Sequence, residues 1–149
     1  MHKYLVVNKP ENWNISMENM EVISAREYLT DPRFSQLKQA RIFNLSKDYS
    51  YQSKGYYVSL LAEARGHLAI PTVMNLVDLR EPKLVKIVSD EFDDLIQKSL
   101  KSIKSPEFTL SIYFGQNVAR KYKELSAMFH RHFQIPFLRV RFQYSNKWN

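Results

Sequence analysis

Residues 41–70 decide the fold, and they read RIFNLSKDYSYQSKGYYVSLLAEARGHLAI. The first six alternate around apolar positions, which is typical of a strand, and a polar loop follows them. From Gly55 to Arg65 the apolar residues recur at helical spacing, and Gly66 supplies a C-terminal stop for that helix. Residues 67–73 form a second apolar run, which predicts another strand. A strand, a helix and a strand in this order predict two parallel neighbours in one sheet.

The rest of the chain continues this alternation. Residues 4–8 predict a short buried strand, and two stretches, 89–103 and 118–133, place their apolar residues on one helical face. Residues 108–114 and 137–144 alternate as strands do. We therefore predict an α/β fold with a mixed, mainly parallel sheet flanked by helices, in which N-terminal strands add an antiparallel edge. An α+β fold is the alternative.

Length and composition bound the class of protein. A chain of 149 residues is long enough to bury a core and suits one domain, residues 1–149. The absence of cysteine excludes disulfide scaffolds, thiol nucleophiles, Cys-ligated zinc and Fe–S clusters. No run of about 18 apolar residues predicts a membrane span, and the N-terminus lacks the apolar core of a signal peptide. We expect a cytoplasmic protein.

The positive charge is unevenly distributed along the chain. The formal net charge is +7, but residues 117–149 hold 7 Lys+Arg against one Asp+Glu. The remaining residues hold 15 against 14 and are nearly neutral. A basic protein of this size suggests nucleic acid as a partner, whereas one basic segment fits a docking face for an acidic partner equally well.

A tyrosine-rich loop, residues 44–57, is the first candidate site. Loops at the carboxyl ends of parallel strands line the ligand crevice of α/β sheets, and the helix start that follows favours an anion. The alternative is that the tyrosines cover the sheet edge while Ser53 caps the helix. The candidate ligand-binding residues, including one on the helix itself, are Asn44, Tyr49, Tyr51, Gln52, Ser53, Lys54, Tyr57 and Arg65.

The basic C-terminal strand is the second candidate site. Alternation places Leu138, Val140 and Phe142 on one face and Arg139 and Arg141 on the other. Such a face is an ordinary solvated surface, a docking surface for another domain, or, least expected, a nucleic-acid surface. The docking candidates are Arg139, Arg141 and Lys147.

Other motifs favour structural roles over chemistry. Asp90, Glu91, Asp93 and Asp94 could ligate a cation, but carboxylates at a helix start complement its dipole, and we prefer that interpretation. His130 and His132 point about 200° apart on a helix and cannot share a metal. His67 is expected to be structural or at the surface. No dinucleotide or P-loop motif occurs, so no catalytic residue, metal site or cofactor is predicted in this chain.

Residues 41–67 also resemble the N-terminal domain of RimK-like ATP-grasp proteins. Shorter similarities cover residues 110–115, 135–142 and 147–148, so the resemblance extends from about residue 41 to the C-terminus. In that family the domain precedes an ATP-grasp module, which joins a carboxylate to an amine through an acyl phosphate, using ATP and Mg²⁺. The resemblance implies no catalytic residues for the N-terminal domain itself.

The resemblance implies an accessory domain for substrate recognition or domain docking. The ATP-grasp module would begin after the last strand, where this sequence ends at Asn149, so we expect ATP, Mg²⁺ and ligase activity only in a parent protein. The expected partner is an ATP-grasp domain in cis, with an amino acid or small peptide as a further candidate. The alternative is a free-standing module that binds nucleic acid or an acidic protein through the basic C-terminal surface.

Overall fold

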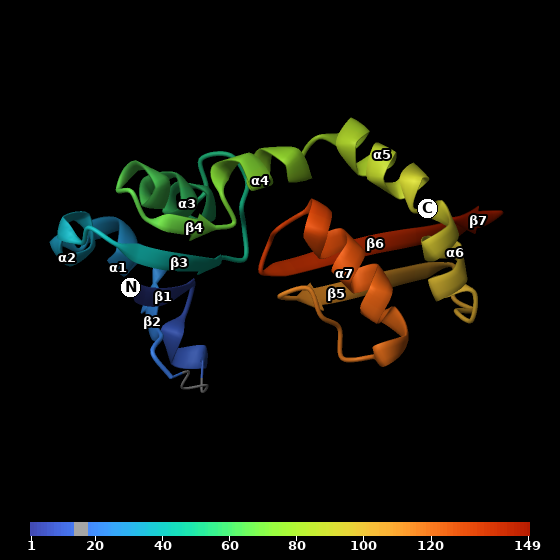
Figure 1. The fold of residues 1–149 in the computed structure, drawn as a ribbon, viewed down its shortest axis with the longest axis horizontal. Coiled ribbons are helices and arrows are strands. Elements are labelled where there is room, and N and C mark those ends of the chain that lie inside the picture. Colours follow the sequence, from blue (N-terminus) through green and yellow to red (C-terminus); the bar gives the residue numbers. More distant parts are fainter. Residues whose placement is uncertain (14–17) are drawn as a thin grey trace. The chain divides into compact units, whose positions relative to one another are not determined.

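The fold is described from a computed structural model, which covers residues 1–13 and 18–149. The chain divides into two compact units, Met1–Leu76 and Val77–Asn149. Figure 1 shows the elements of both. No described helix is long and apolar enough to cross a membrane. The assignment of residues 1–149 to a single domain stays a prediction.

The first unit is built on a parallel sheet in the order β2-β1-β3-β4. Its strands are β1 (His2–Val7), β2 (Glu21–Ser24), β3 (Ala40–Leu45) and β4 (Leu68–Ile70). The helical elements are η1 (Pro10–Asn12), α1 (Ala25–Thr30), α2 (Pro32–Gln36) and α3 (Lys54–Ala64). Helix α4 (Val73–Leu79) carries the chain into the second unit. The core of the first unit includes Val6, Tyr28, Phe34, Ile42 and Val58, all buried.

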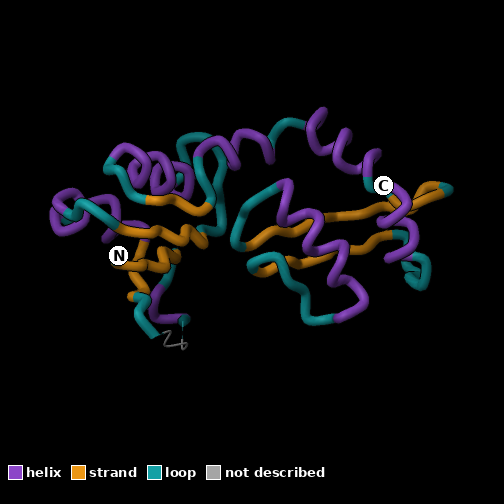
Figure 2. The backbone as a smooth tube through the Cα atoms, viewed as in Figure 1, coloured by secondary structure: helices purple, strands orange, loops and turns teal. Residues whose placement is uncertain are grey.

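The second unit contains a small antiparallel sheet in the order β5-β6-β7. Its elements are α5 (Pro82–Glu91), α6 (Asp93–Leu100), β5 (Glu107–Tyr113), η2 (Arg120–Tyr122), α7 (Lys123–His132), β6 (Phe137–Ser145) and β7 (Lys147–Trp148). Figure 2 shows α7, in purple, crossing one side of the orange strands β5 and β6. The buried side chains of this core include Ile96, Leu110, Leu125, Met128 and Phe142.

The predicted α/β class is confirmed, because a parallel sheet flanked by helices is joined by a smaller antiparallel one. The predicted antiparallel N-terminal edge is wrong: β1 pairs in parallel with both β2 and β3. A connection of a dozen or more residues permits a parallel crossover, and residues 8–20 supply that length.

The last two long strands are antiparallel, although the strand–helix–strand order predicted parallel neighbours. The amide of Phe114, just after β5, donates to the carbonyl of Pro136, just before β6, at 2.7 Å. Figure 1 shows why: the segment after β5 runs back along the sheet before α7 begins. Helix α7 therefore ends beside the end of β5, and the following strand must run in the opposite direction.

The helix predicted over residues 89–103 is divided in two at Phe92, where φ is −107° and ψ is 24°. Asp90 and Glu91 lie at the end of α5, so their predicted place at a helix start is wrong. Asp93 and Asp94 do occupy the first turn of α6, where carboxylates complement the helix dipole. Pattern alone missed the break because the apolar spacing continues across it.

Candidate functional site

The carboxyl edge of the parallel sheet brings the tyrosine-rich loop to a topological switch point. The chain leaves β1 towards β2 on one side and returns as β3 on the other, so the loops after β1 and β3 diverge there. Ligands of open α/β sheets bind at such points. The amide of Lys47 donates to Oδ1 of Asn8 at 3.0 Å, which ties the two loops together.

Asn44 lies under this loop and is fully buried. Its side-chain amide donates to the carbonyl of Gly55 at 2.7 Å and to Oγ of Ser59 at 2.9 Å. Its Oδ1 accepts from the amide of Ser46 at 3.3 Å and from the Ser46 hydroxyl at 2.5 Å. All of these partners belong to the protein, so Asn44 fastens β3 to α3 and has no access to a ligand.

Two further candidates also bond within the loop. The Tyr49 hydroxyl donates to the carbonyl of Asn44, and burial raises the pKa of that hydroxyl. Ser53 is the N-cap of α3: its Oγ accepts from the amide of Tyr56 at 3.2 Å and donates to the carbonyl of Asp48 at 3.1 Å. The cap that the sequence offered as a structural alternative is therefore present. These polar atoms hold the loop in shape.

The exposed tip of the loop is formed by Tyr51, Gln52 and Lys54. Tyr51 is 66% exposed and packs edge-on against Tyr56, with ring centroids 5.3 Å apart. Gln52 adopts a positive φ of 65°, which turns the chain back towards α3. This part of the predicted ligand loop presents polar groups to solvent, as do the exposed residues Lys47, Asp48 and Ser50.

The two candidates on helix α3 lie elsewhere. Tyr57 lines an apolar cavity of about 370 Å³ with Leu29, Leu60, Leu61 and Ala64. Arg65 is the C-cap of α3, where its guanidinium donates to the carbonyl of Tyr28 at 2.7 Å and lies 4.8 Å from the centre of that ring. Because it sits at the opposite end of α3 from the loop, the structure does not bring Arg65 to the same site.

Two of the three docking candidates of the second unit are exposed on one side of β6, whereas the third forms an ion pair. Arg139 and Arg141 are exposed on the side of β6 that faces away from the core. Opposite them on β5 stand Ser111 and Thr109. Lys147 instead forms an ion pair with Asp93, in which Nζ of the lysine lies 3.3 Å from Oδ2 of the aspartate. Its ammonium group therefore has a partner within the unit.

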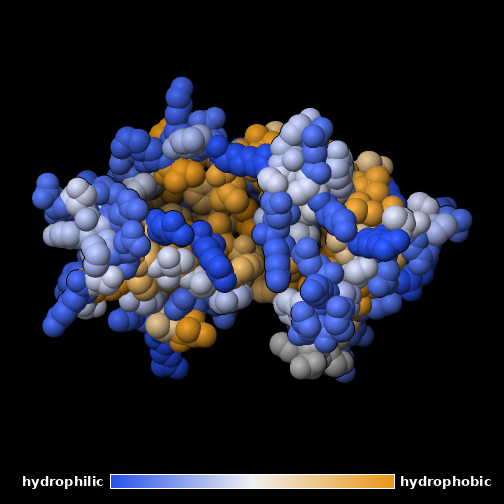
Figure 3. Space-filling view, turned by 180° about the vertical axis from the view of Figure 1, so that it is seen from behind, coloured by the Kyte–Doolittle hydropathy of each residue, from blue (hydrophilic) through white to orange (hydrophobic). Residues whose placement is uncertain are grey.

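We call this side of the strands the open β5–β6 face. Besides the arginines it carries Tyr113 and Phe137, whose rings stack with centroids 4.8 Å apart. The guanidinium of Arg139 lies 5.1 Å from the centre of the Phe137 ring. Figure 3, which views the molecule from behind, shows blue hydrophilic side chains standing beside orange apolar ones in the half that holds these strands. The face thus combines positive charge with exposed aromatic surface.

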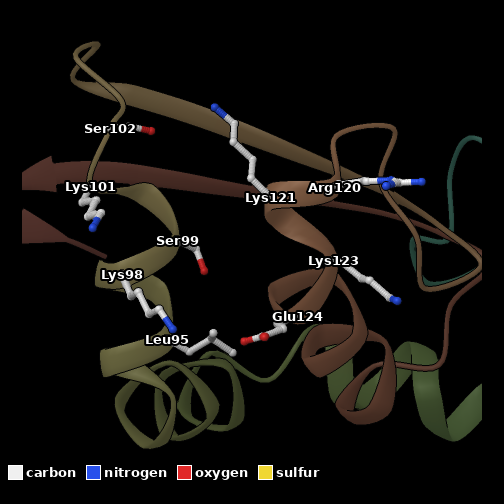
Figure 4. A pocket seen from close by; sticks show the side chains of 9 residues that line it. All are labelled: Leu95, Lys98, Ser99, Lys101, Ser102, Arg120, Lys121, Lys123 and Glu124. Atoms are coloured by element: carbon white, nitrogen blue, oxygen red, sulfur yellow. The ribbon is translucent and has the colours of Figure 1, made fainter.

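A basic cavity in the second unit was missed by sequence reasoning. It has a volume of about 440 Å³ and is lined by Leu95, Lys98, Ser99, Lys101, Ser102, Arg120, Lys121, Lys123 and Glu124 (Figure 4). Lys98 lies in the last turn of α6 and Lys101 is its C-cap, where positive charge complements the helix dipole. The run of basic residues at 120–123 was the available signal, but nothing in the pattern placed it beside α6.

The described residues contain no group of three or more His, Asp or Glu side chains that could hold a metal ion. His67 is buried, with Nδ1 2.7 Å from the Tyr28 hydroxyl and Nε2 2.8 Å from the carbonyl of Leu37. Its predicted structural role is confirmed.

These observations define an α/β protein with a braced loop at its switch point and a basic, partly aromatic second unit. The family model for the RimK-like ATP-grasp N-terminal domain matches residues 25–149. The chain therefore belongs to this family, and the match begins earlier than the resemblance at residue 41 indicated. No curated protein and no solved structure matches the chain significantly.

Proposed function

We propose that this chain is the accessory domain of a RimK-like ATP-grasp carboxylate–amine ligase and docks the ATP-grasp module through the open β5–β6 face. The family match supports the position of the domain before such a module. ATP and Mg²⁺ would then be held by the module. In this proposal the ligase chemistry also belongs to the module, and the present chain positions it.

The observation that carries the docking role is the uncovered side of strands β5 and β6. Helix α7 packs against one side of β5 and β6, while the other exposes Arg139 and Arg141 beside the stacked pair Tyr113 and Phe137. Arginine and aromatic side chains are enriched where protein surfaces meet. The tyrosine-rich loop supports ligand recognition less well, because the polar groups of Asn44, Tyr49 and Ser53 bond within the protein.

The test measures binding between this chain and the ATP-grasp module that its gene encodes downstream or that is supplied as a separate chain. We expect Arg139→Glu with Arg141→Glu to weaken binding by about tenfold or more, because charge reversal at a contact surface opposes association. The matched control is Lys83→Glu with Arg131→Glu, the same charge change at two exposed positions on α5 and α7. Equal binding by both double variants would refute docking through this face.

A second candidate function is a free-standing module that binds nucleic acid on the same face. The observation in its favour is the guanidinium of Arg139 over an aromatic ring, a combination suited to phosphate contact and base stacking. The logarithm of the binding constant for single-stranded RNA or DNA should then fall linearly with the logarithm of salt concentration. Binding should also be lost in the variant Arg139→Glu with Arg141→Glu. Absence of that salt dependence would exclude this function.

A further inference from the structure

The basic cavity of the second unit has the size of a small-molecule site. Its volume of about 440 Å³ falls within the range of cavities that take small ligands. In Figure 4, Lys98, Ser99 and Glu124 project into the space between α6 and α7, and Lys121 rises from η2 towards the side where Ser102 lies. Leu95 supplies the apolar part of the lining. Ammonium and hydroxyl groups thus meet around one hollow.

Positive charge around this cavity exceeds negative charge by a wide margin. The lining holds five basic side chains and one carboxylate, that of Glu124. Figure 4 shows Arg120, Lys123 and Lys101 directed away from the central space, so they raise the potential from the rim. Within the described parts of the chain, none of the five forms an ion pair. Like charges around one cavity repel one another, and a bound anion would relieve that repulsion.

We propose that this cavity binds a small molecule carrying a phosphate or diphosphate group. Lysine ammonium groups and serine hydroxyls donate to phosphate oxygens, and the charge of the lining matches an anion with two or more negative charges. Glu124 repels the phosphate and is available to accept a hydrogen bond from a hydroxyl or amine on the same ligand. The site is separate from the open β5–β6 face, because the two share no residue.

The test uses inorganic pyrophosphate as the probe, titrated into the full chain at constant ionic strength with chloride as the background anion. We expect saturable binding that Lys98→Gln with Lys121→Gln weakens by about tenfold. Succinate, a dicarboxylate, tests whether the cavity prefers phosphate groups to carboxylate groups. It should bind at least about tenfold more weakly than pyrophosphate. Far-UV circular dichroism checks that each variant retains its fold.

Two further variants make the result decisive. Lys83→Gln with Arg131→Gln removes the same charge from the same unit outside the cavity and should change binding by less than about twofold. Glu124→Gln removes the repelling carboxylate and should tighten binding of pyrophosphate by about threefold or more. Three results would each overturn the proposal. They are no saturable binding of pyrophosphate to the wild-type chain, equal weakening of binding by the Lys98/Lys121 and Lys83/Arg131 double variants, and equal binding of succinate and pyrophosphate.

Discussion

Asn44→Ala should be the most damaging single polar substitution in the first unit. The variant removes a fully buried side chain that makes four hydrogen bonds, two as a donor and two as an acceptor. The Ser59 hydroxyl keeps its own bond to the carbonyl of Pro71 at 2.7 Å, so its loss is partial. The amide and hydroxyl of Ser46 both lose an acceptor in a buried place.

The size of the effect follows from these partners. A typical hydrogen bond contributes about 1 kcal/mol net, and a buried group left unsatisfied costs about 1–3 kcal/mol. We therefore expect Asn44→Ala to lower the free energy of unfolding by about 3 kcal/mol. Asn8→Ala is the matched control at the same sheet edge: that side chain is exposed and accepts a single bond, from Lys47, so water replaces it at a cost below about 1 kcal/mol.

The assay is urea unfolding followed by far-UV circular dichroism, combined with hydrogen exchange at the amides of β3 and α3. Asn44→Ala should lower the unfolding midpoint and speed exchange in those two elements, because Asn44 joins them. If Asn44→Ala costs no more than Asn8→Ala, the buried network does not hold the loop, and its polar atoms become available for a ligand once more.

Two other predictions concern single sites. Gly115→Ala should destabilise more than Gly66→Ala: both glycines have positive φ, 81° and 78°, but an added Cβ at Gly115 would lie 2.9 Å from the His130 ring whereas the one at Gly66 meets open space. We expect about 1 kcal/mol for Gly66→Ala and about 2 kcal/mol or more for Gly115→Ala, measured by urea unfolding. Hydrogen bonding from Gln97, and after it the Lys147 ammonium, lowers the pKa of Asp93. The ionised Asp93 carboxylate therefore contributes to stability above the ordinary pKa of an aspartate. This contribution is lost as the pH falls through the lowered pKa. Unfolding curves recorded on descending into that acidic range should converge for wild type and Asp93→Asn, and an unchanged difference would contradict this linkage.

The sequence predicted the parts of the fold that depend on local spacing. The helix predicted over 118–133 is shorter in the structure, Lys123–His132, but its inward face is confirmed, because Leu125 and Met128 are buried as their spacing required. Phe133, just after the helix, is buried as well. The positive φ of Gly66 agrees with its predicted place as the stop after a helix. Strand direction was less predictable: the antiparallel pairing of β5 and β6 depends on the path of the segment after β5, which carries no periodic signal.

The candidate site shows a second limit of pattern. An asparagine, tyrosines and serines after a strand predict ligand contact and internal bracing equally well, since both uses need the same donors and acceptors. Only the distances decide, and they assign Asn44, Tyr49 and Ser53 to the loop itself. The exposed tip at Tyr51 and Lys54 keeps the surface that a ligand would need.

The distribution of charge is where three-dimensional proximity adds most to the sequence. Residues 117–149 hold most of the net charge of +7, which indicated a single basic segment. In the folded second unit that segment contributes to two separate surfaces. Arg139 and Arg141 lie on the open β5–β6 face. Arg120, Lys121 and Lys123 instead join Lys98 of α6 around a cavity. The two surfaces share no residue, so charge removal at one leaves the contacts of the other intact. If one double variant abolished both module docking and pyrophosphate binding while its fold remained unchanged, the charge would act as one general field and neither surface would be a specific site.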